Sequence, residues 1–123
     1  MSTKKLILII EDDREISDTI RDILIDEGYR VEIASNGQAA LDHLGGTLPL
    51  PDVMLLDIMM PIMNGYDFRT IQLADPRLRD IPIIALSADG RIQEKSERLK
   101  VEHFVRKPVE LDVLLELVAQ AVA

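Results

Sequence analysis

The sequence predicts an α/β protein in which a five-stranded parallel sheet carries helices on both faces, a (βα)5 arrangement. Short apolar runs alternate with helical patterns, and the pair occurs five times along the chain. Most of these runs are continuously apolar, which is typical of parallel strands buried on both faces. Strands separated by helices indicate right-handed crossovers within one sheet. A chain of 123 residues has the size of one domain.

The first three predicted elements are a strand, a helix and a second strand. Leu6–Ile10 is a continuous apolar run and is predicted to be a buried strand. A helix follows from about Arg14, with Asp13 as a possible cap, because apolar residues recur there on one helical face. Gly28 is a typical signal for the end of a helix. The shorter segment Arg30–Ala34 alternates partially and is the second predicted strand.

The middle of the chain is predicted to add two helices and the third strand. Residues 35–37 form a turn, and the helix that follows them ends at Gly45 and Gly46. Val53–Leu56 is a continuous apolar run with turn-forming residues before and after it, so it is predicted to be the central buried strand. A helix from about 65 to 73 then precedes a break at Asp75 and Pro76.

The last third is predicted to contain two strands and two helices. Ile81–Leu86 is the fourth strand and Phe104–Arg106 is the short fifth strand. Between them, the turn Asp89–Gly90 leads to a helix over Arg91–Leu99. That helix has few large apolar residues, so we expect it to be the most loosely attached element. The final helix, after Glu110, has a clear apolar face.

The composition excludes several classes of function. The chain has no cysteine, which rules out disulfides, thiol catalysis and thiolate metal sites. Its net charge of −8 argues against nucleic acid as a partner. The first apolar run stops at Glu11, too early for a signal peptide, and no segment is long enough to span a membrane. We therefore expect a cytoplasmic protein with no nucleic-acid or membrane partner.

Polar residues follow four of the predicted strands, at the point where each strand ends. They are Glu11 and Asp12, Asp57, Ser87, and Lys107. The carboxyl ends of parallel strands lie along one edge of the sheet, where ligands bind in open α/β folds. We therefore expect these side chains to lie together, although they are far apart in the sequence.

This set of side chains suits a phosphoryl group and a divalent cation. Three carboxylates repel, by roughly 4 kcal/mol per pair at about 4 Å and an effective dielectric near 20. All-oxygen ligands are those that Mg²⁺ prefers, so Mg²⁺ is the predicted cofactor. The ammonium of Lys107 and the hydroxyl of Ser87 can bind phosphoryl oxygens. A carboxylate can then act as the nucleophile and form an aspartyl phosphate.

These motifs resemble the receiver domain of two-component response regulators, in particular the stand-alone, chemotaxis-regulator-like type. The resemblance covers residues 4–123, which we interpret as one receiver domain. The matching segments are Ile9–Asp13, Asp57–Gly65, Ile84–Ala88 and Phe104–Pro108. It implies a flavodoxin-like fold with sheet order 2-1-3-4-5. It also implies phosphorelay signal transduction, in which the chain is a phosphoprotein rather than an enzyme acting on other substrates.

The resemblance implies a role for each residue of the acidic group. Asp57 would be the phosphoacceptor, receiving its phosphoryl group from a phosphohistidine. Asp12 and Asp57 would be Mg²⁺ ligands, together with the backbone carbonyl of Met59, and Glu11 would act through water. Ser87 and Lys107 would contact the phosphoryl oxygens.

Two of these positions also imply a conformational switch. Ser87 and Phe104 stand at the hydroxyl and aromatic switch positions, where Thr and Tyr are common in the family. The bond between Lys107 and Pro108 is expected to be cis. Met59 and Asp89 stand where receiver side chains flank the water that hydrolyses the aspartyl phosphate. Because Met59 is bulky and apolar, it is expected to slow this hydrolysis.

The implied partners are a sensor histidine kinase or histidine phosphotransfer protein, and an output protein that the sequence does not identify. The chain would be a monomer or weak dimer. A phosphorelay intermediate, a phosphate sink and the receiver fragment of a larger regulator remain alternatives. A phosphatase of the haloacid-dehalogenase type is disfavoured, because it needs a second acid two residues after its nucleophile, where this chain has Met59.

Overall fold

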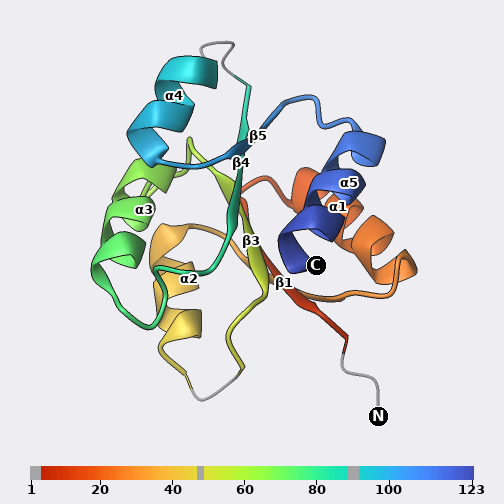
Figure 1. Cartoon of the computed structure of the whole chain (residues 1–123), viewed down its shortest axis with the longest axis horizontal. Coiled ribbons are helices and arrows are strands. Elements are labelled where there is room, and N and C mark those ends of the chain that lie inside the picture. Colours follow the sequence, from red (N-terminus) through yellow and green to blue (C-terminus); the bar gives the residue numbers. More distant parts are fainter. Residues whose placement is uncertain (1–3, 47–48, 89–91) are drawn as a thin grey trace.

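The computed structural model describes residues 4–46, 49–88 and 92–123, and it has the predicted alternation of strands and helices (Figure 1). The strands are β1 (Leu6–Ile10), β2 (Arg30–Ala34), β3 (Val53–Asp57), β4 (Ile83–Ser87) and β5 (His103–Arg106). The helices are α1 (Arg14–Asp26), α2 (Gly37–Leu44), α3 (Gly65–Ala74), α4 (Ile92–Leu99) and α5 (Leu111–Val122). The strands form one parallel sheet in the order β2-β1-β3-β4-β5, which confirms the predicted topology.

The sheet separates two hydrophobic cores. Helices α1 and α5 lie on one face, and α2, α3 and α4 lie on the other (Figure 1). Side chains alternate along each strand, so neighbouring residues enter different cores: Ile7 and Ile9 face α1 and α5, whereas Leu8 and Ile10 face α2 and α3. Every residue of β1, β3 and β4 is buried, which explains why these strands are apolar up to Asp57 and Ser87, the last residues of β3 and β4.

The register of the strands brings their carboxyl ends to one level. Ile10 at the end of β1 pairs with Leu56, the residue before Asp57. Asp57 pairs with Leu86, and Ser87 pairs with Arg106 at the end of β5. Asp57 and Ser87 at the ends of β3 and β4, and Glu11 and Lys107 just after β1 and β5, therefore lie at a common edge of the sheet, called the carboxyl edge below.

Some predicted boundaries were wrong by one or two residues. Strand β4 begins at Ile83 rather than Ile81, because Pro82 has no N–H to donate, although its carbonyl accepts a hydrogen bond from Met54 N at 2.9 Å. Strand β5 begins at His103, and Gly37, assigned to a turn, is the first residue of α2. Asp89, Gly90 and Arg91, predicted to form a turn and begin a helix, lie outside the described residues.

No helix in the described part of the chain combines the length and apolar character that crossing a membrane requires.

Candidate functional site

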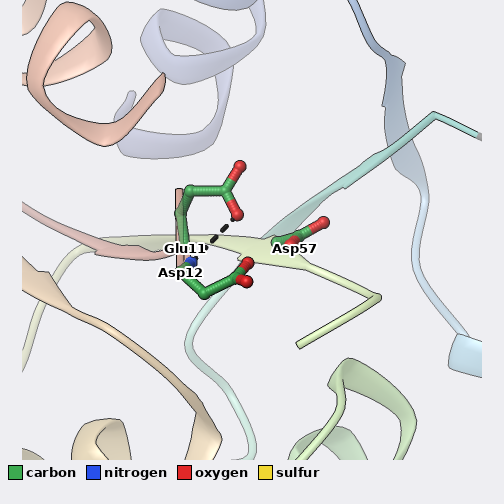
Figure 2. Close-up of side chains that lie close together, drawn as sticks. All are labelled: Glu11, Asp12 and Asp57. Carbon is green, nitrogen blue, oxygen red and sulfur yellow. Dashed lines mark hydrogen bonds between the residues drawn. The ribbon is translucent and has the colours of Figure 1, made fainter. Parts of the chain in front are cut away.

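Three carboxylates meet at the carboxyl edge of the sheet (Figure 2). One oxygen from each of Glu11, Asp12 and Asp57 lies within 4.8 Å of the others. Glu11 and Asp57 are almost fully buried, with 1% and 3% of their surfaces exposed, whereas Asp12 faces solvent. The prediction that these acids converge is confirmed, and the exposed carboxylate leaves the group open to solvent on one side.

The local fold holds each acid in place. Glu11 directly follows β1, and its backbone N–H donates to the carbonyl of Ala34 at 3.0 Å. Asp13, two residues further on, accepts a hydrogen bond from Ile16 N at 3.2 Å and begins α1, as its sequence position predicted. The chain thus turns from strand to helix immediately after Asp12, which leaves the Asp12 side chain beside the other two acids.

Asp57 is the last residue of β3, so its position depends on the strand and on the turn after it. The next backbone N–H, from Ile58, donates to Leu86 O at 3.2 Å and prolongs the pairing with β4. Gly65 N donates back to Ile58 O at 2.8 Å. A Cβ on Gly65 would lie 2.9 Å from Asp57 O, so glycine is needed for this close packing.

Lys107 is the cation of the site. Its ammonium lies 2.5 Å from Glu11 Oε1 and 3.2 Å from Asp57 Oδ1. The backbone N–H of Lys107 donates to Ser87 O at 2.8 Å, and the following bond to Pro108 is cis, as expected. Lys107 therefore joins the ends of β1 and β3 through its side chain and the end of β4 through its backbone.

Burial and the neighbouring charges change the ionisation of this group. Burial raises the pKa of Glu11 to about 8; the Asp57 carboxylate adds to the increase and Lys107 opposes it. Burial disfavours the charged form of Lys107, but its hydrogen bond to Glu11 and the charge of Asp57 outweigh this effect and raise the pKa of Lys107. The ionised form of Glu11 is therefore unfavourable in this group, and a further positive charge at the site would stabilise it.

The remaining predicted residues lie around this centre. Ser87 is buried at the end of β4, and the half-buried Phe104 packs in a small cluster with Ile58, Ala85 and Leu99. Met59 is 69% exposed, so its side chain does not contribute to the core. Asp89 lies outside the described residues.

Sequence reasoning missed the contacts that hold the β3–α3 loop, residues 58–64. Met63 packs against the core under α2 and α3, and its carbonyl accepts a hydrogen bond from Gly37 N at 3.3 Å. Ile62, next to it, has a positive φ of 70°. Gly37 at the start of a helix was the only indication of this contact in the sequence. It does not show that Met63 is the residue packed against it.

The donor set fits a hard divalent cation. It consists of carboxylate oxygens from three acids, and the two buried acids, Glu11 and Asp57, share one ammonium. Oxygen ligands with open access to water are those that Mg²⁺ accepts. Chemically, the arrangement offers a buried carboxylate as nucleophile, an ammonium that can bind an anion and a nearby hydroxyl.

The chain is similar to proteins of one family. The family model described as the response regulator receiver domain matches residues 7–119. A probable transcriptional regulator, ycf29, of Pyropia yezoensis is 32% identical over 95% of this chain and 53% of its own length. The response regulator MprA of Mycolicibacterium vanbaalenii is 33% identical over 89% of this chain and 46% of its own length. The chain thus spans about half the length of these curated relatives.

Solved structures agree with these similarities. The signal receiver domain of a histidine kinase from Syntrophus aciditrophicus has a TM-score of 0.86 at 32% identity, with 96% of this chain and 89% of that one covered. The receiver domain of the Francisella response regulator 1452 has a TM-score of 0.84 at 27% identity, with 97% of each chain covered. The similarity therefore extends over nearly the whole fold described above.

Proposed function

The chain belongs to the response regulator receiver family, and we propose that it is a phosphoacceptor that receives a phosphoryl group on Asp57. The observation that carries the proposal is the position of Asp57, buried at the end of the central strand and 3.2 Å from the Lys107 ammonium. The donor would be the phosphohistidine of a sensor kinase or of a histidine phosphotransfer protein. Phosphorylation would change which output protein the chain binds.

In the proposed transfer, a carboxylate oxygen of Asp57 attacks the phosphorus of the phosphohistidine. The new O–P bond forms as the P–N bond breaks, and the electron pair of that bond returns to the imidazole of the donor. Lys107 neutralises charge on the phosphoryl oxygens, and Ser87 donates a hydrogen bond to one of them. The acyl phosphate that results is buried beside the ammonium, which limits its access to water.

Mg²⁺ is the proposed cofactor. Asp12, Asp57 and the backbone carbonyl of Met59 would be its ligands, with Glu11 acting through water. The bound cation supplies positive charge that offsets both the repulsion between the acids and the charge of the transferring group. The exposed position of Asp12 supports this assignment, because Mg²⁺ keeps several of its water molecules.

A switch through Ser87 and Phe104 is the proposed output. A hydrogen bond from Ser87 to the new phosphoryl group would favour a different packing around Phe104. Phe104 contacts Leu99 at the end of α4, and α4 is linked to α3 by Arg98, whose guanidinium lies 3.8 Å above the Tyr66 ring. Amide exchange on activation should change most between residues 88 and 104; changes confined to α1 and α2 would contradict the switch.

The decisive experiment for the phosphoacceptor is substitution of Asp57. In the presence of Mg²⁺, acetyl phosphate should add one phosphoryl group to the protein, detected by intact mass, and Asp57→Asn should abolish it. Asp52→Asn is a matched control, because Asp52 lies just before the same strand and its amide oxygen can still accept the hydrogen bond from Leu6 N. Labelling of Asp57→Asn at the wild-type rate would refute the assignment.

One observation favours the alternative that this receiver works as part of a longer regulator: the curated relatives are about twice as long as the aligned region. A phosphorelay intermediate or a phosphate sink differs in its output. A relay would pass its phosphoryl group on to a second histidine phosphotransfer protein, whereas a receiver with its own output would retain it until hydrolysis. The experiment mixes the phosphorylated chain with a histidine phosphotransfer protein. Transfer of the phosphoryl group to that protein indicates a relay, whereas retention on Asp57 until hydrolysis indicates a receiver with its own output.

A further inference from the structure

The β3–α3 loop is held in a strained conformation beside the site. Met63 N donates to Pro61 O at 2.7 Å, and Ile62 between them has a φ of 70°. A hydrogen bond spanning three residues with this φ defines the strained form of the γ-turn, and a β-branched side chain there is unfavourable. The Ile62 side chain is 82% exposed, so its own packing does not hold the turn.

The contact that holds the turn lies on its other side, between Met63 and the first residue of α2. Gly37 N donates to Met63 O at 3.3 Å, and the Met63 side chain packs against the core under α2 and α3. A Cβ on Gly37 would lie 2.8 Å from Met63 Cγ and 3.0 Å from Met63 O. The first distance is one that real Cβ atoms essentially never show and the second is tighter than most, so Met63 keeps this position because residue 37 is glycine.

The backbone of Gly37 gives no other reason for glycine. Its φ is not in the left-handed region, where the described glycines include only Gly28. Within a helix, alanine is intrinsically more favourable than glycine. The sole requirement for glycine at this position is therefore the space that Met63 occupies.

We propose that Gly37 is a positioning residue for the cation site, and that it acts by seating Met63 and thereby fixing the β3–α3 loop. This inference rests on the proposed function, in which the loop supplies the backbone carbonyl of Met59 as a ligand. Displacement of Met63 would shift the γ-turn that lies between Met63 and Met59, and would thereby shift the backbone of Met59, whose carbonyl is the proposed ligand. Residue 37 thus controls the cation without contacting it.

The test compares Mg²⁺ affinity, measured by calorimetry, in wild type and Gly37→Ala. We expect the dissociation constant to rise about five-fold, together with faster amide exchange at residues 58–64 in metal-free protein. Helix propensity alone predicts the opposite for stability, because alanine would strengthen α2. Gly45→Ala, at the other end of α2, is the matched control: its Cβ would lie at an ordinary 3.4 Å from Leu41 O, so Mg²⁺ affinity should not change.

A double variant shows whether Met63 carries the effect. In Gly37→Ala combined with Met63→Ala, the new Cβ no longer meets Cγ and Sδ of Met63. The added effect of Gly37→Ala should then fall to within about two-fold of Met63→Ala alone. The double variant is expected to fold even if Gly37→Ala alone does not. Recovery of folding and Mg²⁺ binding in the double variant would then show that the clash with Met63 causes the defect.

Unchanged Mg²⁺ affinity in Gly37→Ala, or a double variant whose loss is the product of both single losses, would overturn the inference. A failure of the proposed function itself would be detected in the wild-type protein. A wild-type protein that binds no Mg²⁺ and takes no phosphoryl group from acetyl phosphate would refute that function, whatever the variants do.

Discussion

The two edges of the sheet both contain buried polar groups, but the groups are arranged in opposite ways. At the carboxyl edge, two buried carboxylates share the ammonium of Lys107, and the exposed carboxylate of Asp12 lies beside them. At the amino edge, where the strands begin, the polar side chains of half-buried Arg69 and buried Gln72 form hydrogen bonds in which each donor has an acceptor. Comparing the two shows which part of the fold serves stability and which part serves chemistry.

The network at the amino edge is centred on Gln72 of α3. Its side chain is fully buried, and Nε2 donates to the carbonyls of Leu78 and Ile81, both at 3.0 Å. Its Oε1 accepts from Arg69 Nη1 at 2.7 Å, and Arg69 also donates to Leu99 O and Lys100 O at the end of α4. Both polar atoms of the Gln72 amide are thus paired, and the amide nitrogen and the Arg69 guanidinium donate to backbone carbonyls of three other segments of the chain.

The contrast has a physical explanation. Complementary partners stabilise a fold, because each buried donor or acceptor regains the hydrogen bond that it lost with water. Like charges held together destabilise it and are retained where a ligand or reaction needs them. Changes at the amino edge should therefore reduce stability without affecting the chemistry, and changes at the carboxyl edge should do the reverse.

The largest effect on stability is expected from Gln72→Leu. The substitution removes the side-chain donor from the buried carbonyl of Ile81 and one of the two donors of Leu78 O, which keeps its hydrogen bond from Ile81 N at 3.1 Å. It also removes an acceptor from Arg69. We expect the free energy of unfolding to fall by about 3 kcal/mol, measured by urea denaturation, with Mg²⁺ affinity unchanged. Gln120→Leu on the exposed side of α5 is the control. A loss of Mg²⁺ affinity in folded Gln72→Leu would contradict the separation of the two edges.

The next effect is a pH dependence that originates at the carboxyl edge. Burial raises the pKa of Glu11 from 4.5 to about 8, so the folded protein binds this proton more tightly than the unfolded chain. Without Mg²⁺, the free energy of unfolding should therefore decrease as the pH rises from about 5 to about 8, on the order of 2 kcal/mol. Glu11→Gln should flatten this decrease in denaturation curves recorded with EDTA. An equal slope in both proteins would exclude Glu11 as its source.

A smaller effect is expected on the lifetime of the aspartyl phosphate. Met59 is mostly exposed beside Asp57, where its apolar side chain cannot orient a water for attack. Met59→Asn should speed loss of the phosphoryl group about ten-fold, or 1.4 kcal/mol in the barrier, with little change in stability. The measurement is the decay of phosphorylated protein with Mg²⁺ present and no partner. Equal or slower decay would show that side chain 59 does not control access of water.

The smallest effect on stability is expected at Asp12, because this acid faces solvent. Asp12→Ala removes one of three like charges and should raise the stability of the metal-free protein by about 0.5 kcal/mol. The same change should weaken Mg²⁺ binding at least about ten-fold, which calorimetry can detect. Asp13→Ala is not a suitable control, since Asp13 caps α1, but exposed Asp22→Ala on that helix is. Unchanged Mg²⁺ affinity would exclude Asp12 as a ligand.

The sequence by itself determined the class of fold and the main residues of the candidate site. Apolar runs and helical periodicity depend on neighbours within a few residues, and they are sufficient to distinguish buried strands from helices. In a parallel sheet all carboxyl ends share one edge, so Asp57 and Lys107 could be placed together from their positions after two strands. The network of Arg69 and Gln72 was not predictable in this way, because nothing near either residue in the sequence indicates its partners.

Only the tertiary structure decided which groups touch. Lys107 lies closer to Glu11, 96 positions away in the sequence, than to Asp57, 50 positions away. Likewise, the packing of Met63 against Gly37 depends on how closely the β3–α3 loop approaches the start of α2. Such contacts follow from strand register and from differences of a few tenths of an ångström in close packing, which depend on the whole fold and leave no local pattern in the sequence.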